Sequence, residues 1–373
     1  MSARERSASR RPAERKHGHG RLIAACLLVL CLIGGGVAVV SGVAGETPRI
    51  AQPAAQPPGP PAASPTKVGS LAVPPRPVPP APFRSFSAAE LGEMVDVTDE
   101  AQRLPRLSPS GWMPWIAYAR RFDPSGPPAR VGVLMINLGA SEALTRRAIE
   151  ELPGEVSLAF LASTPDLPRW LGEARERGHE VYLMLPVEDP SGPAERGLRP
   201  IQTSLEATEN VRRLRAAMAR GEFYVGFAAA FAGPVWQSEA AARPLLQEIA
   251  DRGLALIEIN PTPATATVHR LTEELGIGYA RTAEVLDYRL SDGGIAGNLD
   301  RLDAWVRETA PEQPPRHRFG VVQPTDEAID AIVAWFRRRP ERPAAALVPI
   351  IGHFECRDAC MARVRVQPAQ LRP

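Results

Sequence analysis

This 373-residue sequence lacks an excess of either charge sign. It has 44 Lys and Arg residues and 42 Asp and Glu residues, which leave a net charge of +2. Binding to the phosphates of a nucleic acid needs a concentrated basic surface, so this balance argues against a nucleic-acid partner. A glycine-rich phosphate loop is also absent. The glycines at 34–36 lie in an apolar run, and Asp292-Gly293-Gly294 is typical of a turn.

Cysteine is scarce, with four residues that fall into two pairs. Cys26 and Cys31 lie in the longest apolar run, where they are most simply small apolar side chains. Cys356 and Cys360, near the C-terminus, are a candidate disulfide if the compartment is oxidising. Their i, i+4 spacing on a helix would be near the limit of about 6 to 7 Å between Cα atoms, so two free thiols stay the alternative. Together with His353 they make only three metal ligands, whereas structural zinc sites usually take four.

The longest run without charge covers residues 22–45 and follows a basic segment, residues 1–21. Such a run is long enough to cross a bilayer, and the basic flank predicts that its amino end is cytoplasmic. We therefore expect a single-pass signal anchor in a bacterial-type inner membrane, with the C-terminal part in the periplasm. The alternative is secretion after cleavage, with Leu22 to Ile33 as the apolar region of a signal peptide and Gly42-Val43-Ala44 as its cleavage site.

Residues 46–82 form a proline-rich linker, in which thirteen prolines occur between positions 48 and 82. This composition cannot bury a core and favours an extended, disordered spacer. Residues 83–129 form a lead-in segment that begins with a capping-box pattern, Ser87-Ala88-Ala89-Glu90. Trp112, Trp115, Tyr118 and Phe122 follow at helical spacing and predict one helix face that packs on the main domain, with a sugar-stacking platform as the alternative.

From residue 130 to residue 350, apolar runs alternate with helical patterns. The expected strands are 131–136, 156–161, 180–185, 223–229, 254–259, 317–322 and 345–350. The expected helices are 141–152, 167–177, 204–220, 237–252, 265–275, 295–309 and 326–338. This alternation predicts right-handed crossovers and a parallel sheet. With about seven or eight strands, the sequence favours an α/β fold, a parallel (β/α) barrel that is distorted or incomplete.

Several stretches in this region occur in the order typical of one family. They are Ile136-Asn137-Leu138-Gly139, Leu152-Pro153, Leu185-Pro186-Val187-Glu188, Thr203-Ser204-Leu205, Tyr224-Val225-Gly226-Phe227 and Pro261-Thr262-Pro263-Ala264. The segment resembles the divergent polysaccharide deacetylases, which are relatives of the NodB-type carbohydrate esterases with a distorted (β/α) barrel. The resemblance implies a role in carbohydrate metabolism, and its strength lies in the ordered set rather than in any one stretch.

Active members of the wider family end their first strand in two aspartates, one a metal ligand and one a general base, and histidines complete the site. Such a set polarises an acetamide carbonyl, activates water and protonates the leaving amine. Measured against this pattern, the chain departs at each point: it has Ile136-Asn137, Ala228-Ala229-Ala230, Glu258-Ile259-Asn260 and Gln323. The resemblance therefore implies a barrel whose metal and acid/base positions are substituted.

The histidines lead to the same expectation without the family. His17 and His19 precede the apolar run, His179 and His317 open predicted strands, His269 is in a predicted helix, and His353 follows the last strand. Active sites of parallel barrels lie at the carboxyl ends of the strands, and none of these histidines is expected there. The polar residues expected there are Asn137, Thr164, Glu188, Asp189, Glu258, Asn260, Asp287 and Gln323.

Three hypotheses follow from these residues. The first is a membrane-anchored domain that binds a glycan or a cell-envelope protein without deacetylase activity, with a ligand cleft at Asn137, Thr164, Glu188, Asp189, Asn260 and Gln323 and no metal or other cofactor. The second is an active hydrolase on an acylated polysaccharide, in which Glu188 and Glu258 are the catalytic candidates and a divalent metal takes part. The third is an envelope scaffold.

Overall fold

The structure is a computed structural model that describes residues 81–123, 126–188, 198–231, 233–261, 265–290, 293–308, 316–340 and 343–354. The predicted anchor, most of the linker, Asp189 and both C-terminal cysteines lie outside these residues. No helix within the described ranges is both long enough and apolar enough to cross a membrane.

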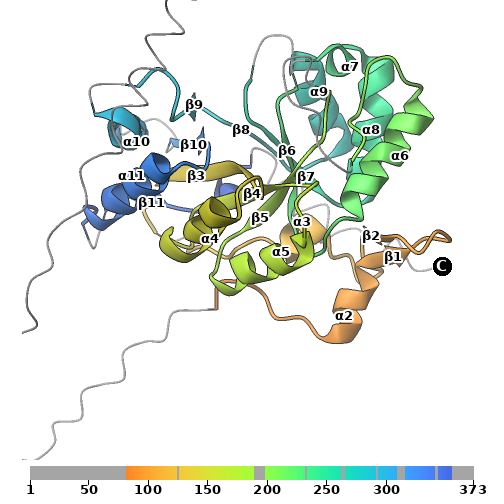
Figure 1. Cartoon of the computed structure of the whole chain (residues 1–373), viewed down its shortest axis with the longest axis horizontal. Helices are drawn as coiled ribbons and strands as arrows, with labels where there is room; N and C mark the ends of the chain where they lie inside the picture. The colour runs from red at the N-terminus through yellow and green to blue at the C-terminus, as the bar shows by residue number, and fades with distance from the viewer. Residues whose placement is uncertain are drawn as a thin grey trace, which may run out of the picture. The chain divides into compact units, whose positions relative to one another are not determined.

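A single parallel sheet forms the centre of the domain (Figure 1). Its strands follow the order β8-β7-β6-β5-β4-β3-β10-β9, and β11 pairs with the beginning of β3, before the β4 ladder starts. The expected strands are present, whereas β8 and β9 are additional. The bounds are β3 Ala129–Leu138, β4 Ser157–Leu161, β5 Val181–Met184, β6 Gly226–Ala229, β7 Ala255–Glu258, β8 Tyr279–Arg281, β9 Glu284–Val285, β10 His317–Val322 and β11 Ala345–Leu347.

The two ends of this strand order are neighbours in the chain, because only Thr282 and Ala283 separate β8 from β9. The backbone nitrogen of Thr282 donates to the Glu258 carbonyl of β7 at 2.9 Å. The nitrogen of Ala283 donates to the Phe319 carbonyl of β10, also at 2.9 Å. One extended segment therefore changes partner from β7 to β10 and closes the sheet on itself, which confirms the predicted distorted barrel.

Helices follow the strands and surround the sheet (Figure 1). Two of them start at side-chain caps: Ser141 accepts a hydrogen bond from the Leu144 nitrogen at 3.4 Å, and Thr325 accepts one from the Ala328 nitrogen at 3.1 Å. The bounds are α4 Glu142–Glu151, α5 Leu167–Glu176, α6 Ala207–Met218, α7 Pro234–Gln237, α8 Glu239–Asp251, α9 Ala266–Leu275, α10 Gly294–Arg307 and α11 Asp326–Arg337.

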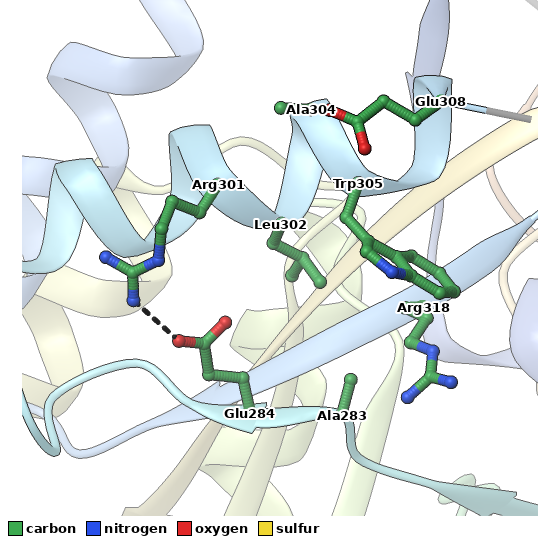
Figure 2. Close-up of a pocket in the computed structure, with 8 residues that line it drawn as sticks. All are labelled: Ala283, Glu284, Arg301, Leu302, Ala304, Trp305, Glu308 and Arg318. Atoms are coloured by element: carbon green, nitrogen blue, oxygen red, sulfur yellow. Dashed lines mark hydrogen bonds and ion pairs between the residues drawn. The ribbon is translucent and has the colours of Figure 1, made fainter.

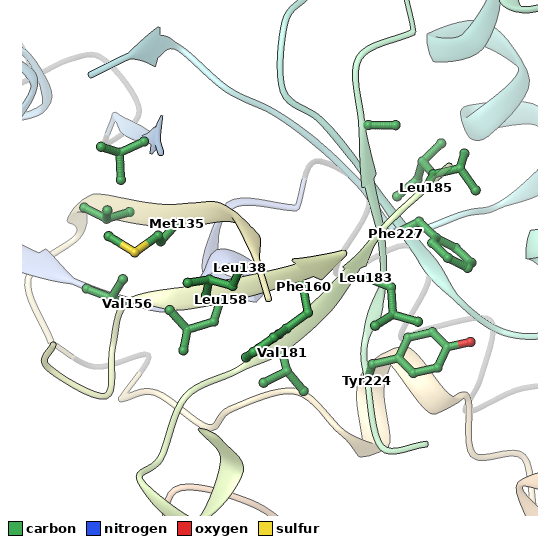
Figure 3. Packing of buried hydrophobic residues seen from close by; sticks show 14 of the residues in the cluster. Met135, Leu138, Val156, Leu158, Phe160, Val181, Leu183, Leu185, Tyr224 and Phe227 are labelled. Atoms are coloured by element: carbon green, nitrogen blue, oxygen red, sulfur yellow. The ribbon is translucent and has the colours of Figure 1, made fainter. Parts of the chain in front are cut away.

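Two hydrophobic cores lie on the two sides of the sheet, because successive strand residues point to opposite faces. In β4, Leu158 and Phe160 join the outer core, which also contains the buried residues of the surrounding helices, and Ala159 joins the inner core. In β5, Leu183 belongs to the outer core and Tyr182 to the inner one. Figure 3 shows the outer core around Leu158, Phe160 and Leu183.

The lead-in segment confirms one prediction and corrects another. Both arms of the capping box are present at α2, Ala88–Glu93, and a hairpin of β1, Val95–Val97, and β2, Arg103–Pro105, follows. The helix expected across the aromatic residues is only the single turn α3, Pro114–Ala117. Trp115 and Tyr118 are nevertheless buried in the inner core, so the predicted packing on the main domain is correct.

Two segments close the amino end of the barrel: the lead-in segment, which precedes the barrel in the sequence, and the segment that follows β11. After β11 the chain leaves the sheet, so the strand expected to reach Ile350 ends at Leu347, and a short 3-10 helix, η2 Ile350–His353, enters the inner core. Glu180, at the start of β5, is fully buried there. Its carboxylate accepts hydrogen bonds from the backbone nitrogens of Arg120 in the lead-in, at 3.0 Å, and of Ile351 in η2, at 3.1 Å.

Candidate functional site

The end of β3 is distorted where the sequence predicts a site. The pairing register with β4 shifts between Met135 and Leu138, which marks a bulge in the strand. Within it, Asn137 has a φ of 58°, in the left-handed region that asparagine tolerates better than most residues. Bulges beside functional sites redirect side chains, and this one accompanies a half-buried amide at the strand end.

Asn137 forms a hydrogen-bonded chain with the ends of two other strands. Its Nδ2 donates to Oε1 of Gln323, just past β10, at 3.0 Å. The backbone nitrogen of Gln323 donates to Oδ2 of Asp287, just past β9, at 2.8 Å. Three segments that are distant in sequence thus present amide and carboxylate groups at one edge of the barrel.

Tyr288 directly follows Asp287 and is 62% exposed, more than any other large hydrophobic residue of the described part of the chain. The guanidinium of Arg289 lies 5.3 Å from the centroid of its ring. We call Asn137, Asp287, Tyr288 and Gln323 the strand-end cluster. The sequence did not point to Tyr288, because β9 is only two residues long and shows no strand pattern.

Thr164 supports the strand-end cluster without presenting a group to a ligand. Its side chain is buried, and its hydroxyl donates to the Leu161 carbonyl at 2.6 Å. It packs directly over Gly139, which has a φ of +98° and where a Cβ atom would lie 1.9 Å from the Thr164 hydroxyl oxygen. The nitrogen of Gly139 donates to the Thr145 hydroxyl at 2.9 Å, so this turn fixes the start of α4.

Glu188 is half-buried just past β5, and its carboxylate is already engaged. Oε1 accepts hydrogen bonds from the backbone nitrogen of Thr203, at 2.8 Å, and from the Thr203 hydroxyl. It thereby holds the segment that precedes α6. Asp189, predicted beside it, lies outside the described residues.

Glu258 does not lie in the expected cleft. It is fully buried, and Oε2 accepts a hydrogen bond from the Tyr279 hydroxyl, whereas Oε1 has no hydrogen-bond partner. Leu256, two residues earlier on the strand, and Tyr279 both belong to the outer core, so the Glu258 side chain points toward the helices. Asn260, by contrast, is exposed beyond the end of β7.

The donor set of the strand-end cluster does not fit a catalytic divalent metal, which usually takes three protein ligands. The cluster has one carboxylate, and that of Asp287 accepts from the Gln323 nitrogen. Among the described residues, no group of three or more His, Cys, Asp or Glu side chains is arranged to hold a metal ion. His179 and His317 lie at strand starts, as predicted, and His353 lies in η2, at the opposite end of the barrel.

Two cavities lie away from the strand-end cluster. One, of about 510 Å³, is next to α10 and is lined in part by Glu284, Arg301, Trp305 and Arg318. Figure 2 shows its Glu284–Arg301 ion pair, 3.0 Å long, with Trp305 and Arg318 at the other side. The second cavity, of about 330 Å³, lies where the barrel closes between β8 and β10.

Comparison with known proteins places this fold in a family. The family model for divergent polysaccharide deacetylases matches residues 133–350, more than half of the chain. The chain belongs to the divergent polysaccharide deacetylase family. The match runs from the middle of β3 to the first residue of η2, so it takes in all the other strands of the barrel and leaves out the lead-in segment.

Solved structures include one of a similar fold. An uncharacterised protein from Agrobacterium tumefaciens C58 is 27% identical with a TM-score of 0.60, and the alignment covers 67% of this chain and 99% of that one. A protein from Enterococcus faecalis V583 is 11% identical with a TM-score of 0.35, over 63% of this chain and 94% of that one. No curated protein matches the sequence.

Proposed function

We propose that this divergent polysaccharide deacetylase binds a glycan at the strand-end cluster and does not hydrolyse it by a metal-dependent route. The observation that carries the proposal is the hydrogen-bonded chain Asn137–Gln323–Asp287, followed directly in sequence by the exposed ring of Tyr288. Amides and a carboxylate supply both donors and acceptors for sugar hydroxyls and acetamido groups. An aromatic ring supplies a flat apolar surface on which the C–H face of a sugar ring stacks.

The positions of the two candidate carboxylates favour binding over hydrolysis. Glu258 is buried on the side of the sheet that faces the helices, where it has no path to a substrate at the strand ends. Glu188 is held by Thr203. A general base must lie within hydrogen-bond reach of the proton that it removes, and a water-activating metal needs more ligands than this cluster offers.

The proposal places this domain in the periplasm of a bacterial-type cell. Residues 1–21 are basic, residues 22–45 carry no charge, and the composition of the proline-rich linker favours an extended spacer between bilayer and domain. A protease added to intact spheroplasts should cleave the domain if it is periplasmic. Protection of the domain until the cells are lysed would refute this part of the proposal.

Calorimetric titration of the full-length protein in detergent with an N-acetylated oligosaccharide tests binding. Tyr288→Ala and Gln323→Ala should each weaken binding about five- to tenfold, the equivalent of one lost stacking or hydrogen-bonding contact. Phe336→Ala is the matched control, because Phe336 is also an exposed aromatic residue, 38% exposed, but lies in the last turn of α11.

Each of the following results would overturn the proposal. Binding that is equally weakened by Phe336→Ala, or no binding at all, would remove the strand-end cluster as a glycan site. Acetate release that depends on added Zn²⁺, Co²⁺ or Mg²⁺ and is abolished by Glu188→Ala would instead establish the active hydrolase. Recovery of envelope proteins in a pulldown, without glycan binding, would favour the scaffold.

A further inference from the structure

A cavity of about 330 Å³ lies at the closure of the barrel, a size within the range of small-molecule sites. At this closure the chain passes from β8 to β9, so that β8 and β10 do not pair directly. Rim residues of the cavity are exposed to solvent, and its floor is buried. The residues that line it are Pro261, Arg281, Thr282, His317, Arg318, Phe319 and His353.

The lining of this cavity carries basic groups and no carboxylate. Arg281 and Arg318 are both exposed at its rim, and His317 lies at the start of β10. The guanidinium of Arg318 lies 4.4 Å from the centroid of the Trp305 ring, and no ion pair joins it to a described carboxylate. Basic groups gathered in a concave site produce a field that attracts anions.

His353 forms the floor of the cavity and is only 3% exposed. Its ring centroid lies 5.7 Å from that of His317 and 5.6 Å from that of Phe319. Both ring nitrogens are shielded from solvent, and neither makes a hydrogen bond of regular geometry, although the ring contacts the Val131 carbonyl. The ring fits here because Gly132 opposite lacks a side chain: a Cβ atom at that position would lie 2.5 Å from Nε2 of His353.

We infer that this cavity binds a phosphate oxyanion, either free or carried on a sugar. The guanidinium groups of Arg281 and Arg318 supply charge-assisted donors from the rim, His317 adds a ring nitrogen beside them, and His353 lies beneath as part of the cavity floor. No carboxylate of the lining competes with the anion for these donors. This site is separate from the strand-end cluster and does not depend on the glycan proposal.

Calorimetric titration of the full-length protein in detergent, with inorganic phosphate in one arm and N-acetylglucosamine 6-phosphate in the other, tests the inference. One phosphate per chain should bind, and Arg318→Ala should weaken binding about tenfold, since it removes a charge-assisted donor. Arg212→Ala is the matched control, because Arg212 is an exposed arginine on α6 with its side chain 62% exposed. Tighter binding of the sugar phosphate than of inorganic phosphate would identify the source.

A second readout does not rely on a buried substitution. In a spectrum of the histidine side-chain nitrogens, phosphate should shift the signals of His353 and His317 and leave that of His269, on α9, unchanged. Absence of saturable binding would overturn the inference. So would binding that Arg212→Ala weakens as much as Arg318→Ala, because it would reflect only general attraction to basic residues.

Discussion

The carboxylate of Glu180 and the backbone nitrogen of Ile351 form a hydrogen bond of 3.1 Å, although 171 positions separate the two residues. The same carboxylate accepts from the hydroxyls of Tyr182, at 2.7 Å, and Ser157, at 3.3 Å, and from the backbone nitrogen of Arg120. Burial raises the pKa of Glu180 above its usual range, and these hydrogen bonds oppose the shift. One buried carboxylate therefore connects the lead-in segment, two strands and η2.

We expect Glu180→Gln to destabilise the protein by about 3 kcal/mol, because the amide NH₂ would face a donor where the carboxylate accepts one. Urea unfolding followed by circular dichroism would measure the change. The matched control is Glu173→Gln on α5, where Glu173 pairs with Arg169 on the surface and the expected change is below about 0.5 kcal/mol. Equal effects of the two substitutions would contradict a structural role for Glu180.

Stability should fall as the pH decreases from 7 to 5, in part because of His353. Burial lowers the pKa of His353 to about 3, the charges of His317 and Arg130 add to the shift, and a contact with the Val131 carbonyl opposes it. The unfolded chain, with an ordinary pKa, then binds more protons than the folded protein below about pH 6.5. The contribution of His353 to the free energy of unfolding is therefore fully present above about pH 6.5, and it is lost as the pH falls toward 3.

Glu180 has the opposite effect, because its raised pKa favours the folded state at lower pH. This effect is present in both wild type and His353→Gln, so a comparison of the two proteins isolates the contribution of His353. Between pH 7 and pH 5, wild type should lose about 2 kcal/mol more than the variant in phosphate-free buffer. His269→Gln, on α9, is the control. Parallel pH profiles for wild type and His353→Gln would disprove the assignment.

The backbone at Asn137 offers a third prediction. Its φ of 58° is strained for alanine and not for glycine. Both Asn137→Ala and Asn137→Gly lose the hydrogen bond to Gln323, so their difference reports the backbone alone. We expect Asn137→Ala to be less stable than Asn137→Gly by about 1 kcal/mol in urea unfolding. The reverse order would show that the residue leaves this conformation when its side chain is removed.

The boundaries of the folding unit give a fourth prediction. A fragment limited to residues 133–350, the extent of the family match, lacks the Arg120 and Ile351 nitrogens that Glu180 accepts from, and also Trp115 of the inner core. It should show no cooperative thermal transition, whereas a fragment of residues 81–354 should show one. A cooperative transition in the shorter fragment would mean that both terminal segments are accessory.

The sequence predicted the barrel well because its long strands and helices carry strong patterns. β3 and β4 were expected within a few residues of their bounds because their apolar runs are long, and the helices expected from 141 and 326 begin within a residue of those positions. The capping box at Ser87 was equally clear. What the sequence could not show is how short segments complete the sheet: β8 has three residues and β9 two, too few for a pattern.

The site was harder to predict because two strand-end side chains meet only if both point to the same face of the sheet. Asn137 and Gln323 were expected at the strand ends and do meet there. Glu258 was expected with them, but β7 is buried on both faces, so its sequence has no alternation that shows where Glu258 points. The helical spacing of the lead-in aromatic residues also misled the prediction of helix length. Trp115 lies in the single turn α3 and Tyr118 directly follows it, yet both reach the inner core.

The passage from β8 to β9 has a further consequence. In a regular barrel a continuous ladder of hydrogen bonds joins the first strand to the last and leaves no opening in the wall. Here the peptide between Thr282 and Ala283 makes that connection, so the wall is held by a covalent link rather than by paired strands. The irregularity that separates this barrel from an ideal one thus also places a solvent cavity in the wall, at the point where a regular barrel would have paired strands.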